Sequence, residues 1–319
     1  MSTAPRPIII DTDPGQDDAV AILLALASPE LDLKGITCVA GNVPLDYTTA
    51  NARKICEVAG RPEVKIFAGC DRPLVGDLVT AEHVHGLTGL DGANLPDPTM
   101  ALQDEHAVDW MIETLVAAGE AGTPITLCTL GPLTNVATAF AREPGIAAGI
   151  ERIVAMAGSI FEGGNVAPAA EFNVYVDPEA AEAVFTAGVP VTLIPLDVTH
   201  HAIATKARSA RIAAKGGPVA DAVAGMLNFY NRFDEGRFGL DGGALHDPCV
   251  IAWLLRPGLF GGREVNLRVE CASPLVRGMT VVDWWGVTGR PKSALVLTEI
   301  DDDGFFALLE ERLARLPAG

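Results

Sequence analysis

IIIDTDPGQDDAV, residues 8–20, is the stretch that decides the fold. The apolar run at 8–10 predicts a buried strand, and the run DDAVAILLALA at 17–27 predicts a helix that ends near Ser28 and Pro29. A strand that leads directly into a helix is typical of a mainly parallel sheet covered by helices. The stretch therefore predicts an α/β fold that has several aspartates between its first strand and its first helix.

The rest of the chain continues this alternation of strands and helices. Short apolar runs predict further strands at 33–39, 64–67, 125–129, 152–156 and 191–195. Helical patterns occupy 45–59, 106–118, 134–142 and 178–187. Past residue 200 we expect helical material over 203–233, a helix from about 247 to 255, strands at 264–270, 279–283 and 293–297, and a closing helix near 304–316. Because no repeat or linker interrupts the chain, we expect one domain over residues 1–319.

The composition excludes several classes of protein. The 319 residues carry 23 Lys+Arg and 41 Asp+Glu, a net charge of −18 that disfavours nucleic acid or an anionic membrane as the main partner. The longest apolar run, 19–27, is too short to span a bilayer, and the N-terminal residues do not resemble a signal peptide. The cysteines are scattered without metal-binding spacing, which is typical of free thiols in a reducing compartment. We therefore expect a cytoplasmic protein.

Four carboxylates gather at the end of the first predicted strand. Asp11 and Asp13 follow the apolar run, and Asp17 and Asp18 open the helix. Ligands of α/β proteins bind at the carboxyl ends of strands, and clustered carboxylates repel one another unless a cation neutralises them. Oxygen ligands suit Ca²⁺ or Mg²⁺ better than zinc. The structural alternative is that Asp17 and Asp18 only cap the helix, but four aspartates in this short stretch favour a metal site.

The same pattern also resembles that of a different class of enzyme. Asp11-x-Asp13 after an apolar strand is similar to the nucleophile motif of haloacid dehalogenase-type phosphatases, which use Mg²⁺. That motif has Thr or Val at the position of Gly15, and we find no convincing later acidic loop for the metal. A Mg²⁺-dependent phosphatase with Asp11 as its nucleophile remains an alternative hypothesis.

Polar residues also follow the other predicted strands. Taken singly, each is explained as a turn or cap residue, and Asp247 before Pro248 has the pattern of a helix N-cap. Together they bring carboxylate, amide and imidazole groups to one edge of the sheet, which suits a polyhydroxylated ligand held through a hard metal ion. These residues are Asn42, the LGPLTN segment that starts at Leu130, Asn165, Glu171, Asn173, His246 and Asp247.

Two further pairs of residues, one of histidines and one of tryptophans, are weaker candidates for the site. His83 and His85 lie in a long Gly-rich loop, and long loops in compact domains are usually functional. Trp284 and Trp285 are adjacent on a late strand, where packing or an interface is the more common role. We therefore keep the histidines near the candidate site and leave the tryptophans out of it.

The motifs DTDPGQDDAVAILLAL, VAGN, VHGLTGLDG, LGPLTN, EFNVYVDPEA and HDP occur in this order from about residue 7 to beyond residue 282. In this order they resemble the inosine-uridine-type nucleoside hydrolases. The resemblance implies one α/β domain with a mixed, mostly parallel Rossmann-like sheet, a bound Ca²⁺, and hydrolysis of ribonucleosides to ribose and free base. It also implies a homodimer or homotetramer.

The resemblance assigns a role to each matching position. It implies metal ligation by Asp13, Asp18, the Leu130 carbonyl and Asp247. It implies ribose binding by Asp17, Asn42, Asn165, Glu171 and Asn173. In this scheme Asp13 accepts a proton from a metal-bound water that attacks the anomeric carbon, through a transition state like that of glycoside hydrolysis. His246 would protonate the leaving base, with an ordinary pKa of about 6.5, and His85 would lie near the base.

The segment before His246 departs from the family pattern. Where family members often carry tyrosines, this chain keeps Tyr230 and has Phe233 and Arg237 nearby. Base preference is therefore less well defined than the reaction, and we expect uridine and inosine, or pyrimidine nucleosides, to be favoured. A non-catalytic nucleoside-binding protein is the third hypothesis, against which the intact Asp13 and His246 count.

Overall fold

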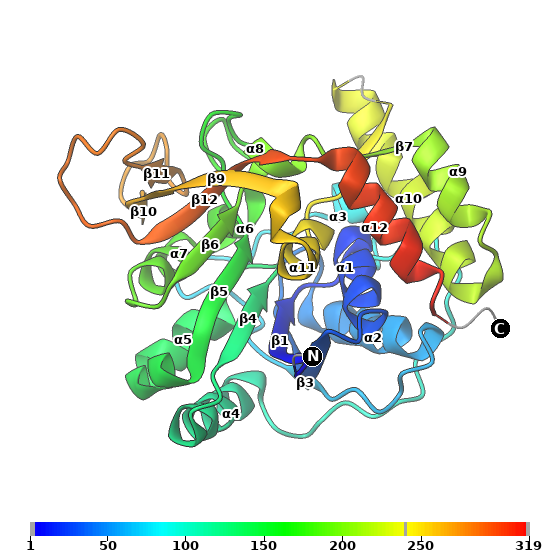
Figure 1. Ribbon diagram of the computed structural model, residues 1–319, viewed down its shortest axis with the longest axis horizontal. Coiled ribbons are helices and arrows are strands. Elements are labelled where there is room, and N and C mark those ends of the chain that lie inside the picture. The colour runs from blue at the N-terminus through cyan, green and yellow to red at the C-terminus, as the bar shows by residue number, and fades with distance from the viewer. Residues whose placement is uncertain (1–3, 239–240, 317–319) are drawn as a thin grey trace.

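The centre of the molecule is an eight-stranded sheet, seen in Figure 1 in a computed structural model that describes residues 4–238 and 241–316. All neighbouring strands are parallel except the last pair, which is antiparallel. The strand order is β3 (Ile66–Ala68), β2 (Leu31–Cys38), β1 (Arg6–Thr12), β4 (Ile125–Thr129), β5 (Ile150–Met156), β6 (Val191–Ile194), β12 (Ala294–Ile300) and β9 (Phe260–Val265). The prediction of a mixed, mostly parallel sheet is confirmed.

The connections create a reversal in the middle of the sheet. From β1 the chain moves outward through β2 to β3, and then returns to the other side of β1 at β4 before it continues to β5 and β6. In open α/β sheets, ligands bind outside the carboxyl ends of the strands at such a reversal. The aspartates that follow β1 therefore lie where this topology places a ligand.

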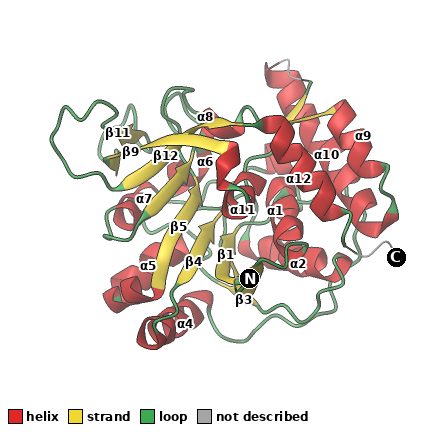
Figure 2. Cartoon of the chain, in the orientation of Figure 1, coloured by secondary structure: helices red, strands yellow, loops and turns green. Residues whose placement is uncertain are grey.

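Helices cover both faces of the sheet (Figure 2). Ile8 and Ile10 of β1 pack into one apolar core and Ile9 into the other, because successive side chains of a strand point to opposite faces. The first core holds α1 (Gln16–Leu26), α2 (Leu45–Val58), α11 (Pro248–Leu255) and α12 (Asp302–Leu313). The second holds α4 (Ala107–Ala121), α5 (Thr134–Arg142) and α7 (Pro178–Phe185). All of α1 is buried, as its apolar sequence requires.

Some predicted elements differ from the structure. The segment 203–233 is not all helical: it begins with β7 (Ile203–Thr205), which pairs with β8 (Gly242–Ala244), and continues as α9 (Lys206–Ala213) and α10 (Gly217–Phe238). The partner strand of β7 lies far along the chain, so local sequence gave no sign of it. The predicted strand 264–270 is divided between β9 and β10 (Leu267–Val269), and β10 pairs with β11 (Thr280–Val282).

Several short helices were not predicted. They are α3 (Glu82–His85), α6 (Phe172–Val176), α8 (Leu196–Thr199) and the 3₁₀ turns η1 (Pro144–Gly149) and η2 (Pro257–Leu259). Three of them, α3, α6 and α8, carry or flank residues of the site described below. The extent of the domain, 1–319, stays a prediction, because both ends of the chain lie outside the described residues.

The free-thiol prediction is confirmed, since every cysteine is unpaired. Cys38, Cys56, Cys128 and Cys249 are buried, and Cys70 and Cys271 are half-buried. Within residues 4–238 and 241–316, none of the helices has the length and apolar character needed to cross a membrane.

Candidate active site

A cavity of about 270 Å³ opens beside the carboxyl ends of the central strands. Nine of the eleven residues expected in the site line it: Asp17, Asn42, His85, Leu130, Asn165, Glu171, Asn173, His246 and Asp247. The remaining two, Asp13 and Asp18, are fully buried next to this lining and are linked to it through Asn42. The structure thus brings together residues that are more than 200 positions apart in the sequence.

Four buried aspartates, Asp13, Asp17, Asp18 and Asp247, form what we call the acidic floor. Carboxylate oxygens of Asp17, Asp18 and Asp247 all lie within 4.8 Å of one another. Asp18 accepts hydrogen bonds from the Thr12 hydroxyl, from Gly15 N at 3.0 Å and from Asn42 Nδ2 at 3.1 Å. Asp18 therefore accepts a hydrogen bond from a free backbone N–H at the start of α1, and its carboxylate also belongs to the cluster with Asp17 and Asp247.

Asp247 precedes Pro248 at the start of α11, where the sequence pattern suggested a helix cap. Its side chain makes no capping hydrogen bond. The carboxylate lies instead in the cluster with Asp17 and Asp18. Asp247 thus occupies the N-cap position with Pro248 in the first turn of α11, as predicted, but its carboxylate belongs to the acidic floor instead of capping the helix.

Asp13 is held at the centre of the floor by close backbone contacts. Its Oδ2 accepts a hydrogen bond from Asn42 N at 2.7 Å. A Cβ atom at Gly41 would lie 2.1 Å from Oδ2, and one at Gly131 would lie 2.3 Å from Oδ1. Only glycine fits at these two positions, so the backbone after β2 and after β4 encloses the carboxylate on both sides.

The floor has the electrostatic properties that suit a bound cation. Burial, together with repulsion from neighbouring carboxylates, raises the pKa values of Asp13 and Asp247 well above their usual range. The same causes raise the pKa of Asp17 to about 8. Among the described residues, Asp13 Oδ1 and Asp17 Oδ1 are buried without any hydrogen-bond partner. Unpaired oxygens and mutual repulsion are what a bound cation would relieve, so these residues fit a metal ion.

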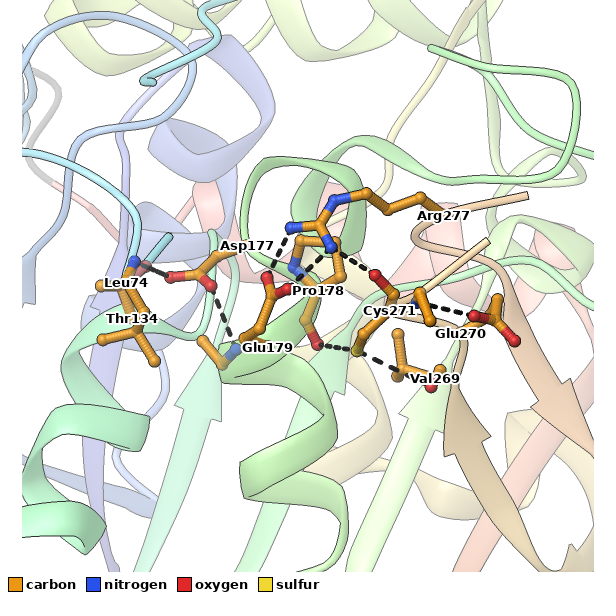
Figure 3. Close-up of polar contacts among 11 residues, drawn as sticks. Leu74, Thr134, Asp177, Pro178, Glu179, Val269, Glu270, Cys271 and Arg277 are labelled. Atoms are coloured by element: carbon orange, nitrogen blue, oxygen red, sulfur yellow. Dashed lines mark hydrogen bonds and ion pairs between the residues drawn. The ribbon is translucent and has the colours of Figure 1, made fainter. Parts of the chain in front are cut away.

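A buried aspartate outside the floor shows that burial alone, which also raises its pKa, does not leave carboxylate oxygens unpaired. Asp177, at the start of α7, is as inaccessible as Asp13. Its Oδ2 accepts hydrogen bonds from Leu74 N at 2.8 Å and from the Thr134 hydroxyl at 2.7 Å, and its Oδ1 accepts one from Ala180 N at 3.0 Å (Figure 3). Both oxygens of Asp177 are satisfied by the protein, which identifies it as a structural carboxylate.

Asp11 differs from its neighbours in the motif. Its Oδ1 accepts hydrogen bonds from the Thr37 hydroxyl at 2.6 Å and from Asn135 Nδ2 at 2.8 Å. Burial raises its pKa to about 6, and Oδ2 has no hydrogen-bond partner within the described part of the chain, but Asp11 is not among the residues that line the cavity there. A phosphatase nucleophile needs access to its substrate, so the position of Asp11 does not favour the phosphatase hypothesis.

Amide and carboxylate groups form one side of the cavity above the floor. Asn173 Nδ2 donates to the carbonyls of Leu130 at 2.6 Å and Met156 at 3.0 Å, which ties the ends of β4 and β5 together. Glu171 caps α6 by accepting from Asn173 N, and it also accepts from Gly158 N, each at 2.8 Å. Burial outweighs these hydrogen bonds and raises the pKa of Glu171 to about 7.

Imidazole and aromatic rings form another part of the cavity lining, which we call the base wall. It consists of His83, His85, Tyr230, Phe233 and His246. The rings of His85 and Tyr230 are 5.5 Å apart, and those of His83 and Phe233 are 5.7 Å apart. These contacts place α3 against α10. Tyr230 and Phe233 therefore line the cavity, whereas the side chain of Arg237 lies outside the described residues.

Two histidines of the base wall, the buried His85 and the half-buried His246, favour the neutral imidazole at neutral pH. Burial lowers the pKa values of His85 and His246 to about 3. The expectation that the pKa of His246 stays near its ordinary value is therefore corrected. His85 Nδ1 lies 2.7 Å from Gln16 Oε1, and His246 Nδ1 lies 2.7 Å from the Thr199 hydroxyl.

Some residues of the site were not found from the sequence. Met156 and His200 line the cavity, and Gln16 and Thr199 hold the two histidines. Thr199 and His200 follow the β6 strand, so the rule applied to the other strand ends would have found them. Trp284 does not line the cavity and packs edge-on against Phe161 at 5.3 Å, consistent with its exclusion from the site.

This arrangement of strands and side chains agrees with the comparisons to known proteins. The chain belongs to the inosine-uridine preferring nucleoside hydrolase family, whose sequence profile matches residues 8–307. It is therefore an enzyme, an N-glycosyl hydrolase of ribonucleosides.

Individual relatives cover almost the whole chain. The pyrimidine-specific ribonucleoside hydrolase RihA of Citrobacter koseri is 47% identical over 97% of this chain and 98% of its own length. The uncharacterized protein C1683.06c of Schizosaccharomyces pombe is 49% identical over 97% and 99%. Among solved structures, the purine-preferring ribonucleoside hydrolase from Gardnerella vaginalis superposes with a TM-score of 0.90 at 32% identity, covering 97% of this chain and 98% of that one.

Proposed function

We propose that this enzyme is a Ca²⁺-dependent hydrolase that prefers pyrimidine ribonucleosides. One observation carries the proposal: the buried trio Asp17, Asp18 and Asp247 lies beside Asp13, whose Oδ1 has no partner among the described residues. The preference for pyrimidines is supported by the pyrimidine-specific RihA relatives at 46–47% identity, which exceed the 32% identity of the purine-preferring structure.

The acidic floor would hold the cation. Asp13, Asp18, Asp247 and the Leu130 carbonyl are the proposed ligands, and Asp17, which lines the cavity, is proposed to face the ribose. A hard divalent cation bound there supplies positive charge that acidifies water and attracts ribose hydroxyls. Oxygen donors without sulfur or imidazole in the trio support Ca²⁺ or Mg²⁺ over softer metals.

Asp13 is the proposed general base. Its Oδ2 is anchored by Asn42 N, so Oδ1 is the oxygen left to accept a proton from the attacking water. The Gly41 and Gly131 backbones fix the direction of the carboxylate, which is what general-base catalysis requires. As the bond to the base breaks, positive charge develops on the ribose ring.

The other polar residues would bind the ribose and stabilise that charge. Asn165 Oδ1 accepts from Phe172 N, so its Nδ2 remains for the substrate. Asn173 commits Nδ2 to backbone carbonyls, so its Oδ1 remains. Glu171 and Asn42 also line the cavity and add further polar oxygen and nitrogen atoms. Fixed carboxylate and amide oxygens favour a positively charged transition state.

The departing base would lie against the base wall, with His85 nearby and with His246 as the group that assists its departure. Because both imidazoles are neutral, His246 is proposed to act as a hydrogen-bond donor instead of an imidazolium acid. The homodimer or homotetramer and the cytoplasmic location stay predictions. Sedimentation of the purified chain tests the first.

A nucleoside panel tests the proposal. The purified enzyme is assayed with uridine, cytidine, inosine, adenosine and guanosine after chelation and again after Ca²⁺ or Mg²⁺ is added back, and free ribose is measured. We expect hydrolysis of uridine and cytidine at least about tenfold faster than of the purines, a difference of about 1.4 kcal/mol. We also expect the chelator to abolish the release of ribose and added Ca²⁺ to restore it. A hundredfold preference for adenosine or guanosine, or full activity in chelator, contradicts the proposal.

A further inference from the structure

Thr199 lies behind His246 and forms the hydrogen bond that fixes its ring. The Thr199 hydroxyl is 2.7 Å from His246 Nδ1, and the threonine is fully buried at the end of α8. The contact has a structural cause. Leu245 N donates to the Ala202 carbonyl at 2.9 Å, next to the β7–β8 ladder, so the two backbone segments that carry Thr199 and His246 are held side by side.

The direction of this hydrogen bond follows from the partners of the hydroxyl. Among the described residues, His246 Nδ1 is the only hydrogen-bond partner of Thr199 Oγ1. If Nδ1 carried the proton, the buried hydroxyl hydrogen would have no acceptor, which is unfavourable. If the hydroxyl donates to Nδ1, both groups are satisfied. A neutral imidazole whose Nδ1 accepts carries its proton on Nε2.

His85, in the same cavity, is held in the opposite way. Gln16 Nε2 donates to the His85 carbonyl at 2.8 Å, which leaves Gln16 Oε1 to accept from His85 Nδ1. His85 therefore has its proton on Nδ1, and its Nε2 is an acceptor. The base wall thus contains two neutral imidazoles with opposite tautomers, each set by a residue behind it.

We propose that Thr199 is a positioning residue that keeps a proton on Nε2 of His246, so that this nitrogen donates a hydrogen bond to the departing base. The inference rests on the proposed function. As the C1′–N bond breaks, its electron pair moves to the base, the water oxygen bonds to C1′, and the water proton goes to Asp13. The Nε2–H stabilises the electron pair on the base without leaving the imidazole, and the base is protonated afterwards by water.

The kinetic experiment compares two leaving groups in Thr199→Val and Thr199→Ser. Uracil needs a hydrogen bond as it leaves, whereas p-nitrophenolate leaves without one. We expect Thr199→Val to lower kcat for uridine by about tenfold or more and to change kcat for p-nitrophenyl riboside by less than about threefold, as loss of one productive hydrogen bond predicts. Thr199→Ser, which restores the hydroxyl, should recover most of the uridine rate.

A matched control removes a buried hydroxyl elsewhere. Thr192 lies on β6 and accepts a hydrogen bond from Arg152, away from the cavity lining. Thr192→Val should not distinguish the two substrates. An equal fall in kcat for both substrates in Thr199→Val means that Thr199 has only a structural role, and no fall for uridine means that it is not needed. Either result overturns the proposal.

Nitrogen NMR of ¹⁵N-histidine-labelled protein reads the tautomers without turnover. We expect Nε2–H for His246 and Nδ1–H for His85 in the unsubstituted chain, with the His246 signals assigned from His246→Gln. In Thr199→Val, the His246 signals should move toward a mixture of tautomers while those of His85 stay unchanged. Nδ1–H for His246 in the unsubstituted chain overturns the proposal. If the enzyme cleaves neither substrate, the proposed function fails, and the NMR spectrum still decides the tautomer.

Discussion

The acidic floor and the base wall belong to the surroundings of one cavity, but they are built differently. The floor aspartates follow β1 or open α1 and α11, and backbone N–H groups of Gly15 and Asn42 hold two of them. The base wall takes four of its side chains from α3 and α10 and the fifth from His246, which precedes α11, and ring contacts between side chains connect α3 with α10. The floor is thus attached to the sheet, whereas the wall depends on how two helices pack.

This structural difference suggests that the acidic floor and the base wall have different roles in the reaction. A group fixed by strand ends keeps its position whatever base is bound, so the floor should determine metal binding and bond cleavage for every nucleoside. A wall of rings carried by helices should determine which base fits and how the site responds to acid. Substitutions in the two regions should therefore have different signatures, and each prediction below tests one part of that contrast.

The largest effect is expected for Asp13→Asn. Loss of the proposed general base should lower kcat/KM by about 10³-fold, because general-base catalysis contributes roughly 10²–10⁴. The fall should be equal for uridine and inosine, so that their ratio does not change. Thermal stability should not decrease, because the substitution removes one of several mutually repelling buried carboxylates. Steady-state kinetics with both nucleosides and thermal unfolding measure these outcomes.

Asp177→Asn is the control for burial. An asparagine cannot accept all the hydrogen bonds that Asp177 accepts from Leu74, Thr134 and Ala180. We expect a loss of about 1–3 kcal/mol in the free energy of unfolding, with kcat of the folded enzyme retained. If Asp177→Asn abolished catalysis and Asp13→Asn did not, the distinction between satisfied and unsatisfied carboxylates would be wrong.

The contrast between the acidic floor and the base wall also explains which residues of the site could be predicted from the sequence. Asp13, Asp17 and Asp18 lie within one local motif, and Asn42 and Leu130 come directly after strands, so the parallel sheet alone brings them together. The assignment of Asp247 to the metal came from the family resemblance, since its local pattern indicated only a helix cap. The mostly parallel sheet followed from the alternation of strands and helices, whereas the order of its strands became visible only in the structure.

The histidines of the base wall were expected near the site, but the way in which the wall is assembled could not be predicted in this way. The position of Tyr230 and Phe233 depends on how α10 packs against α3, and no local pattern encodes that contact. β7 was missed for the same reason, because its partner β8 lies almost 40 residues later. The pairs Gln16–His85 and Thr199–His246 join residues 69 and 47 positions apart, so their hydrogen bonds were visible only in the structure.

A second floor prediction concerns Gly131→Ala. A Cβ atom there would lie 2.3 Å from Asp13 Oδ1, so the carboxylate must move. Misplacement by about 1 Å can cost about 10²-fold in rate, and we expect a loss of this size that is again equal for all nucleosides. Gly258→Ala is the matched control, because no atom of residues 4–238 or 241–316 lies within 4 Å of a Cβ at that position. A loss confined to one nucleoside would mean that the floor also selects the base.

Stabilisation of the fold by Ca²⁺ should also distinguish the acidic floor from the base wall. Ca²⁺ at about 100 times its Kd should stabilise the chelator-treated enzyme by about 2.7 kcal/mol. Asp247→Asn should lose most of this gain, because it removes one carboxylate of the buried trio. Tyr230→Phe, a base-wall variant, should keep it. Thermal unfolding with and without Ca²⁺ measures the gain, and an equal gain in Asp247→Asn would exclude that residue as a ligand.

The smallest expected effect concerns the dependence of folding stability on pH. As the pH falls, the floor and the base wall should change the free energy of unfolding in opposite directions. Floor carboxylates with raised pKa values bind protons more readily in the folded state, so without Ca²⁺ they favour folding as the pH falls. His85 does the reverse, because burial lowers its pKa from 6.5 to about 3. The unfolded chain then binds the extra proton, and the stability contributed by neutral His85 is complete above pH 6.5 and is lost as the pH falls below it.

At pH 5 this loss should reach about 2 kcal/mol, at 1.36 kcal/mol for each pH unit below the unfolded pKa. His85→Gln has no titrating group at this position, so its free energy of unfolding should fall by about 2 kcal/mol less than that of the unsubstituted enzyme between pH 7 and pH 5. Urea unfolding at both pH values, with Ca²⁺ present throughout to keep the floor carboxylates ionised, measures the difference. Parallel pH profiles for the two proteins would show that His85 is not the acid-sensitive group of the wall. Since the carboxylates are the same in both proteins, this comparison isolates the wall from the floor.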